Sequence, residues 1–256
     1  MKGVHRAVVL ILLAGCAAGA AAAELDGALQ WAQRVELGVP VSGVITEVAV
    51  DAGDAVGKGQ VLLRLDDRSF QAALKKTKAH LQSCRENRDE AERELERAQE
   101  MYDRTLLADH DLQMAKIAVS KAEAALAAAE AERTLAALDL EYSQLKAPFD
   151  GWVLERRAAP GQAVVSRMQS TTLLTLVELA RMRARIMADA DELAALAQGT
   201  PVQVRVAGKT YSGRVQAAGL EPIGSSAATP RYPVDVIFET GSDGPLRAGQ
   251  AATVVY

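Results

Sequence analysis

The sequence is poor in the features that most nucleic-acid-binding and catalytic sites need. Aromatic residues make up only 4% of its 256 positions, so aromatic platforms for stacking bases are not expected. The formal net charge is −4, which provides no general attraction for nucleic acid. No nucleophile elbow and no phosphate-binding loop is present. We therefore predict no nucleic-acid partner, no cofactor and no catalytic residue.

Histidine and cysteine are equally scarce. The three histidines are His5, His80 and His110, and their positions lack the spacing of metal ligands, so we predict no metal site. Of the two cysteines, Cys84 has no disulfide partner in the mature chain unless Cys16 survives unmodified. We interpret Cys84 as a small buried apolar residue.

The N-terminus has the pattern of a secretory signal peptide. A basic region containing Lys2 and Arg6 precedes an apolar run over residues 7–13, which is too short for a permanent membrane span. The following LAGC sequence ends at Cys16 and resembles the lipobox of bacterial lipoproteins. We predict a signal peptide over residues 1–23, a periplasmic location, and a lipid on Cys16 that anchors the protein to the inner membrane. Cleavage after residues 21–23 is the alternative, and it would remove Cys16.

Glycine and proline are absent from residues 67–144, where alanine, leucine, glutamate, lysine and arginine dominate. This composition predicts continuous helix. Two heptad series follow each other and indicate an antiparallel hairpin with a narrow seam. The large seam positions are Leu74, Leu81, Arg88, Leu95 and Tyr102 on the first arm, and Leu112, Val119, Leu126, Arg133 and Leu140 on the second. Small residues follow three positions later on both arms, from Thr77 to Thr105 and from Ala115 to Ser143.

The expected tip of the hairpin is residues 106–111, where Asp109 is predicted to cap the second arm. Each arm would be on the order of 55 Å long. Arg88 and Arg133 interrupt the apolar seam, so they either extend to solvent or set the register by pairing with acidic neighbours. The other charges on the arms are typical of a solvated helix face.

Residues on the two sides of the hairpin carry matching β patterns. Residues 39–66 include GVITEVAVDAGDAVGKGQVLLRLD, and residues 145–177 include LKAPFDGWVLERRAAPGQAV; each runs from a Gly-containing strand through a turn to Gly-Gln and a second strand. Each is half of a small β-sandwich, so the two must meet in space. The glycines of these halves, Gly43, Gly53, Gly57, Gly59, Gly151 and Gly161, are predicted to occupy turns with positive φ.

Residues 24–38 precede the first half as a lead-in strand, and residues 178–256 follow the second half. The latter segment consists of short alternating strands and one short helix near residues 189–197, which predicts a small antiparallel β-barrel. The expected fold is thus mixed α and β and elongated: a lipoyl-like sandwich split by a coiled-coil hairpin and followed by a barrel.

This order of segments resembles the periplasmic adaptor proteins, also called membrane fusion proteins (HlyD-like), of bacterial efflux and secretion pumps. The strings quoted above carry the resemblance, together with ELAALAQGTPVQVRV and the closing LRAGQAATVVY. The resemblance implies a non-enzymatic protein that forms a ring, a trimer or a hexamer. It also implies two partners: an inner-membrane transporter, with the resistance-nodulation-division (RND) type favoured and an ABC-type exporter as the alternative, and an outer-membrane channel of the TolC kind.

Two departures from the family pattern affect the expected sites. Channel-docking adaptors carry Arg, then Leu, then Ser at the hairpin tip, and the matching positions here are Arg97, Met101 and Ala108, with Leu107 beside the last. The missing hydroxyl would remove a hydrogen bond of about 1 kcal/mol and weaken docking. The family's additional membrane-proximal domain has no counterpart in this sequence, so we expect either that the barrel contacts the transporter directly or that the partner is not an RND pump. A lipid on Cys16 would supply part of the membrane attachment.

A biotinyl or lipoyl carrier is the remote alternative, because the split module resembles those domains. Such a carrier attaches its cofactor to a lysine in a tight hairpin between the halves. The corresponding residues, 65–68, are Leu-Asp-Asp-Arg and lead into the helical arms.

Overall fold

The structure is a computed structural model that describes residues 23–166, 171–223, 230–241 and 246–256. Residues 1–22 of the predicted signal peptide, including Cys16, lie outside the described residues. The chain divides into two compact units, one holding the β-sandwich with the helical hairpin and the other holding the β-barrel. The mixed α and β fold class is confirmed.

The sandwich consists of two four-stranded sheets, and both sheets combine strands from the two distant halves. One has the order β2 (Arg34–Leu37), β9 (Leu174–Glu178), β7 (Gly151–Arg156), β4 (Ala55–Val56). The other has the order β6 (Gln144–Lys146), β5 (Val61–Leu65), β3 (Gly43–Val48), β8 (Ala163–Val164). Because each sheet contains strands from both halves, neither half could form its sheets alone.

The core of the sandwich is apolar and comes from both halves. Leu62 and Leu63 from the first half and Leu173, Leu174 and Leu176 from the second are fully buried. Complete burial of a leucine side chain contributes about 1.5–3 kcal/mol. The two halves therefore share one core.

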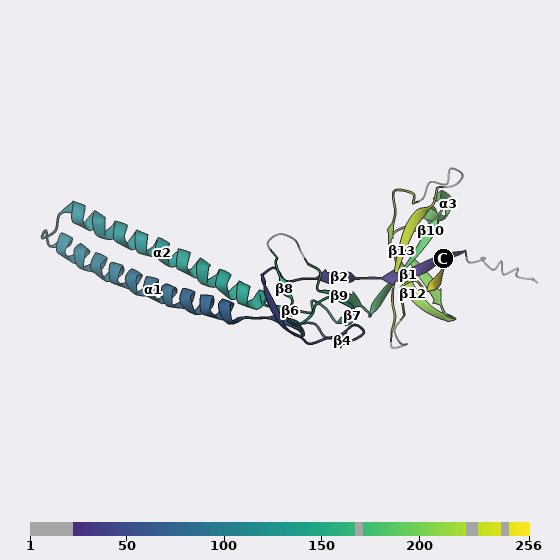
Figure 1. Ribbon diagram of the computed structural model, residues 1–256. Coiled ribbons are helices and arrows are strands. Elements are labelled where there is room, and N and C mark those ends of the chain that lie inside the picture. The colour runs from purple at the N-terminus through teal and green to yellow at the C-terminus, as the bar shows by residue number, and fades with distance from the viewer. Residues whose placement is uncertain (1–22, 167–170, 224–229, 242–245) are drawn as a thin grey trace, which may run out of the picture. The chain divides into compact units, whose positions relative to one another are not determined.

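The hairpin follows from the pairing of two strands. Helix α1 (Arg68–Asp103) begins just after β5, and helix α2 (Asp109–Tyr142) ends just before β6. Strands β5 and β6 pair antiparallel, with Arg64 opposite Gln144. The chain thus leaves and re-enters the sandwich at one place, and the two helices run side by side from it (Figure 1).

The barrel has six strands and closes in the order β1-β10-β13-β12-β11-β14. Their bounds are β1 (Glu24–Trp31), β10 (Arg181–Ala188), β11 (Pro201–Val206), β12 (Lys209–Ala218), β13 (Tyr232–Glu239) and β14 (Ala251–Val255). A short helix, α3 (Ala190–Ala195), follows β10 and is capped by Asp189.

The predicted lead-in segment differs from the single strand that we expected. Residues 24–38 form two strands, of which β1 belongs to the barrel and β2 to the sandwich. The reason is closure: β14 needs a partner on its free edge, and β1 pairs with it from Glu24 opposite Val255 to Ala28 opposite Ala251. The barrel therefore includes β1, which lies outside the expected residues 178–256.

Candidate functional site

The junction between sandwich and hairpin is held by backbone and side-chain hydrogen bonds. The Leu65 N–H donates to the Ser143 carbonyl at 2.8 Å, which ties β5 to the end of α2. Ser143 is fully buried, and its hydroxyl donates to the Leu140 carbonyl at 2.7 Å. These contacts fix the position from which both helices leave the sandwich.

An ion pair adds to this junction at the start of α1. The Arg68 guanidinium donates to both carboxylate oxygens of Asp66, with Nε 2.9 Å from Oδ1. Hydrogen bonds from the Arg68 side chain and backbone lower the pKa of Asp66 to about 2. The carboxylate is thus ionised at any physiological pH.

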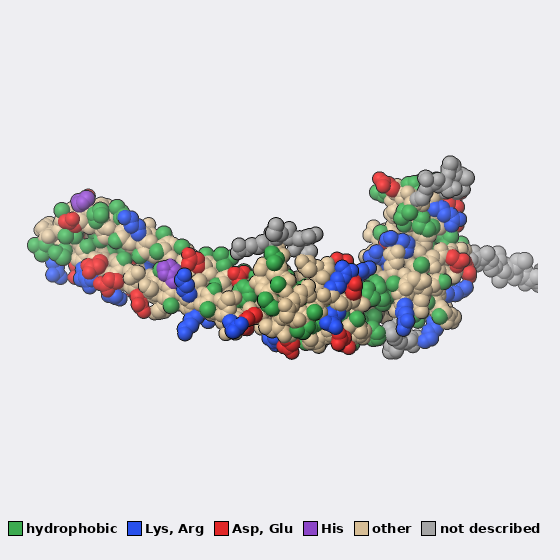
Figure 2. Space-filling view, viewed as in Figure 1, with side chains coloured by type: hydrophobic (Ala, Val, Ile, Leu, Met, Phe, Trp, Pro, Cys, Tyr) green, Lys and Arg blue, Asp and Glu red, His purple; other side chains and the backbone are tan. Residues whose placement is uncertain are grey.

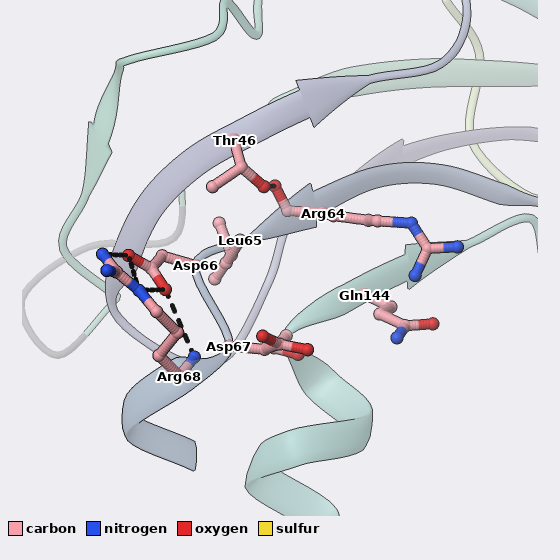
Figure 3. A pocket seen from close by; sticks show the side chains of 8 residues that line it. Thr46, Arg64, Leu65, Asp66, Asp67, Arg68 and Gln144 are labelled. Atoms are coloured by element: carbon pink, nitrogen blue, oxygen red, sulfur yellow. Dashed lines mark hydrogen bonds and ion pairs between the residues drawn. The ribbon is translucent and has the colours of Figure 1, made fainter. Parts of the chain in front are cut away.

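Figure 3 shows a pocket of about 340 Å³ at this junction, with Arg64 and Gln144 on one side and Asp66 and Arg68 on the other. Its lining residues are Thr46, Arg64, Leu65, Asp66, Asp67, Arg68, Ser143 and Gln144. The lining contains no lysine, the residue on which a biotinyl or lipoyl carrier would hold its cofactor.

Side chains that join the two halves of the sandwich were missed by the sequence analysis. The Asp150 carboxylate accepts from the Lys58 backbone N–H at 2.7 Å, and Arg156 Nε lies 2.7 Å from Asp51 Oδ1. Each pair is about 90 residues or more apart in sequence, and no spacing rule identifies such pairs. They add polar links to the shared core.

Apart from Arg133, Tyr102 and Thr105, the seam positions are buried or half-buried. Leu81 and Leu112 are buried, and the other apolar seam positions, Leu74, Leu95, Val119, Leu126 and Leu140, are half-buried. Among the small residues, Cys84 and Ala129 are buried against Leu81. The large side chains of one helix thus pack over small ones of the other, and the free thiol of Cys84 lies inside this packing.

The polar seam positions differ from the apolar ones. Arg88 is half-buried and donates to Glu92 at 3.0 Å; this bond, with Asp89 and Glu123 nearby, raises its pKa. Arg133 is exposed and lines a groove of about 590 Å³ between the helices, next to Arg85, which lies 3.7 Å from Glu130. Tyr102 and Thr105 are also exposed. Their expected place in the seam was wrong because α1 ends at Asp103 and the chain turns there.

The tip of the hairpin is shifted from the predicted residues 106–111 to the loop over residues 104–108. Asp109 does not cap α2 but is its first residue; Ala108 is the N-cap, in an extended conformation and without a side-chain hydrogen bond. The turn contains no glycine and is made instead by Thr105, with φ of 58°. Asp109 and Asp111 still place negative charge in the first turn, where it favours the helix dipole.

The predicted docking residues lie near this tip in different environments. Arg97 is about half exposed and is paired with Glu90, at 3.1 Å, and with Glu94. Hydrogen bonds to Glu94 and then to Glu90 raise its pKa. Met101 is 45% exposed, Leu107 is half-buried and Ala108 is exposed. An apolar and a cationic group are therefore both accessible close to the tip.

Among the described residues, no helix combines the length and the apolar character needed to cross a membrane. Among the same residues, no group of three or more histidine, cysteine, aspartate or glutamate side chains is placed to hold a metal ion.

A barrel-sandwich domain interrupted by a helical hairpin and accompanied by a β-barrel is the architecture of membrane fusion proteins. The membrane fusion protein Spr0693 from Streptococcus pneumoniae R6 has this fold, with a TM-score of 0.69 and 19% identity over 91% of this chain and 98% of that one. MacA from Actinobacillus actinomycetemcomitans superimposes with a TM-score of 0.60 and 22% identity over 91% of this chain and 78% of that one.

The sequence comparison identifies the family. The family of the CzcB-like, barrel-sandwich hybrid domain matches residues 33–175, which is more than half of the chain, and the chain belongs to this family. The macrolide export protein MacA of Yersinia pestis is 29% identical over 204 residues, which cover 73% of this chain and 55% of that protein. The chain therefore spans about half the length of the curated relatives that it matches. The resemblance to the membrane fusion proteins is confirmed, and this family is non-enzymatic.

Proposed function

We propose that this chain is a periplasmic adaptor that links an inner-membrane transporter to an outer-membrane channel of the TolC kind. The observation that carries the proposal is the hairpin, about 54 Å long at 1.5 Å per residue, inserted between two halves of one sandwich. This arrangement holds a long, narrow structure at a fixed place on a compact domain. It provides reach and contact surface without any catalytic chemistry.

Docking to the channel is proposed to use Arg97, Met101, Leu107 and Ala108. Arg97 presents a guanidinium held in position by two carboxylates, and Met101 provides apolar surface next to it. Such a combination suits a partner with a backbone carbonyl or a carboxylate beside an apolar contact.

The test compares Arg97→Glu with Arg93→Glu in cells that express the tagged full-length protein. Both substitutions reverse a charge on α1 and break an ion pair with Glu90, so they are matched in helix propensity and charge. We expect Arg97→Glu to lower co-purification of the channel and Arg93→Glu to leave it unchanged. Equal recovery with both variants would remove Arg97 from the docking site.

The transporter is proposed to be of the RND type, with an ABC-type exporter as the alternative. Mass spectrometry of the inner-membrane proteins that co-purify with the tagged chain distinguishes the two, since only the second contains a nucleotide-binding cassette. Macrolides are the first cargo to test, because the relatives with 28–29% identity are macrolide export proteins.

The membrane end is proposed to be held by a lipid on Cys16, and the sandwiches are proposed to pack side by side into a ring of three or six copies. An N-terminal triacyl mass on the purified mature protein would support the lipid. A mature N-terminus at Glu24 would contradict it.

A further inference from the structure

Helix α2 carries a second apolar stripe that faces away from α1. Its positions recur at alternate spacings of three and four residues from Met114 to Tyr142, two residues after the positions of the seam. All nine positions are exposed: Met114, Ile117, Lys121, Ala124, Ala128, Ala131, Leu135, Leu138 and Tyr142. The large side chains lie at the two ends, with Met114 at 49% and Ile117 at 46% near the tip, and Leu135 at 63% and Leu138 at 37% near the sandwich.

A heptad stripe is the pattern by which a helix packs against another helix. Because α2 uses one such stripe on α1 and repeats the pattern on its opposite side, it has the character of a helix that is covered on both faces. The stripe contains one charged residue, Lys121, and no acidic residue. Its middle positions, Ala124 and Ala128, are small enough for close approach of a second helix.

The outer edge of α1 does not match this stripe. That edge carries Glu86, Glu90, Arg93 and Arg97, and both arginines donate hydrogen bonds to Glu90 along the helix. Figure 2 shows acidic and basic side chains gathered along the edge of the hairpin formed by α1, more densely than along α2. Among the described helices, the one surface with a matching apolar heptad is α2 itself.

We propose that the exposed face of α2 binds the same face of α2 in a second copy of this chain, with the two helices antiparallel. In this register Met114 lies opposite Leu138 of the second copy, Ile117 lies opposite Leu135, and Ala124 lies opposite Ala128. Large side chains then meet large ones at both ends, and small ones meet in the middle. The contact is isologous, so one patch serves both copies.

Charge selects the antiparallel direction over the parallel one. Parallel helices in register would bring Lys121 against Lys121 and would bring Glu141 close to Asp139 of the second copy, which costs free energy. In the antiparallel pair Lys121 lies beside Ala131 and near Glu132 of the second copy, so its ammonium group gains an opposite charge. The pair therefore replaces two repulsions by an attraction on each side.

The consequence for function rests on the proposed adaptor role, whereas the pairing itself does not. Two antiparallel hairpins point their tips in opposite directions, so they cannot both dock to one channel. The pair is therefore a state of the free adaptor, and it must separate before a ring with all tips on one side forms.

Disulfide crosslinking of the full-length protein tests the arrangement, in a background with Cys16→Ala and Cys84→Ala. We expect Met114→Cys mixed with Leu138→Cys to give a disulfide-linked dimer. Each variant alone should give almost none, because its own two cysteines would lie about 36 Å apart. Strong crosslinking of Met114→Cys alone would show parallel helices and overturn the proposal, as would absence of product in the mixture.

A second experiment measures self-association by analytical ultracentrifugation. The double variant Leu135→Glu, Leu138→Glu should weaken the dimer about tenfold or more, whereas the control Ala79→Glu, Ser83→Glu on the outer edge of α1 should not. Circular dichroism checks that both variants keep their helices. Unchanged association of the first variant would refute the contact, and channel recovery with Arg97→Glu would still test the adaptor role separately.

Discussion

Replacing Gly151 by alanine should destabilise the sandwich, because this glycine lies where two strands come unusually close. A Cβ atom on Gly151 would lie 2.2 Å from the Val177 carbonyl oxygen, whereas ordinary contacts of a Cβ atom begin near 3.4 Å. Val177 belongs to β9, which is paired with β2 on one side and β7 on the other. The obstacle is therefore backbone that both neighbours hold in place, and it cannot move away alone.

The expected cost can be worked out from two opposing effects. Overpacking in a well-packed interior costs about 1–3 kcal/mol, and a displaced backbone places this site in the upper part of that range. The alanine also restricts the unfolded chain, which returns about 0.4–1 kcal/mol. We expect Gly151→Ala to lower the free energy of unfolding of the sandwich by about 2 kcal/mol.

Urea denaturation followed by the fluorescence of the neighbouring Trp152 measures this loss. Gly57→Ala is the matched control, since a Cβ atom there has only Asp150 Oδ1 nearby, at 3.7 Å, and Gly57 does not have a positive φ. The control should be as stable as the wild type or slightly more so. Equal unfolding midpoints for the two variants would refute the argument from close approach.

Three further predictions concern the hairpin, its junction and the barrel. Ala129→Leu should lower the free energy of unfolding by about 1–3 kcal/mol, because Ala129 is 1% exposed and the larger side chain would overpack the seam. Ala127→Leu, on the exposed side of α2, should cause no such loss. Thermal unfolding followed by circular dichroism measures both. NMR titration should find a pKa of about 2 for Asp66, and this pKa should rise toward 3.8 in Arg68→Gln. Because the pKa of Asp66 is lowered in the folded state, the stabilisation of the fold by this ion pair is complete above about pH 4 and is lost as the pH falls toward 2. Asp189→Ala should cost about 1 kcal/mol, seen as a lower melting temperature of the barrel, because Asp189 accepts hydrogen bonds from two backbone N–H groups at the start of α3.

The split sandwich and the hairpin could be predicted because both leave strong local signals. A long run without glycine or proline predicts helix, and the two heptad series within it predict which faces of the two helices pack against each other. The return of the chain to one place then follows from the two incomplete β patterns, which the pairing of β5 with β6 confirms. Each of these inferences needs only the order and period of residue types.

Contacts between distant strands left no such signal. The positive φ predicted for six glycines occurs at Gly53, Gly59 and Gly161, while Gly151 is required for the close approach of β9. Likewise, β1 joins the barrel because β14 needs a partner, a requirement that a propensity for β structure cannot reveal. The hairpin turn was predicted at the wrong residues for a related reason. The turn uses Thr105 in the left-handed region, and a residue other than glycine in that conformation gives no sequence signal.

The two stripes on α2 show how one periodicity can have two structural meanings. Packing of the first stripe against α1 explains why Leu112 and Ala129 are buried, but the same helix exposes Met114 and Leu135 at an equally regular spacing. Propensity cannot explain this second stripe, because polar residues would serve an exposed helix face better and α1 uses them on its own outer edge. An apolar heptad that one chain leaves uncovered indicates contact with a helix of another chain. For this reason the outer face of α2, rather than the charged edge of α1, is where association of the free protein should first be sought.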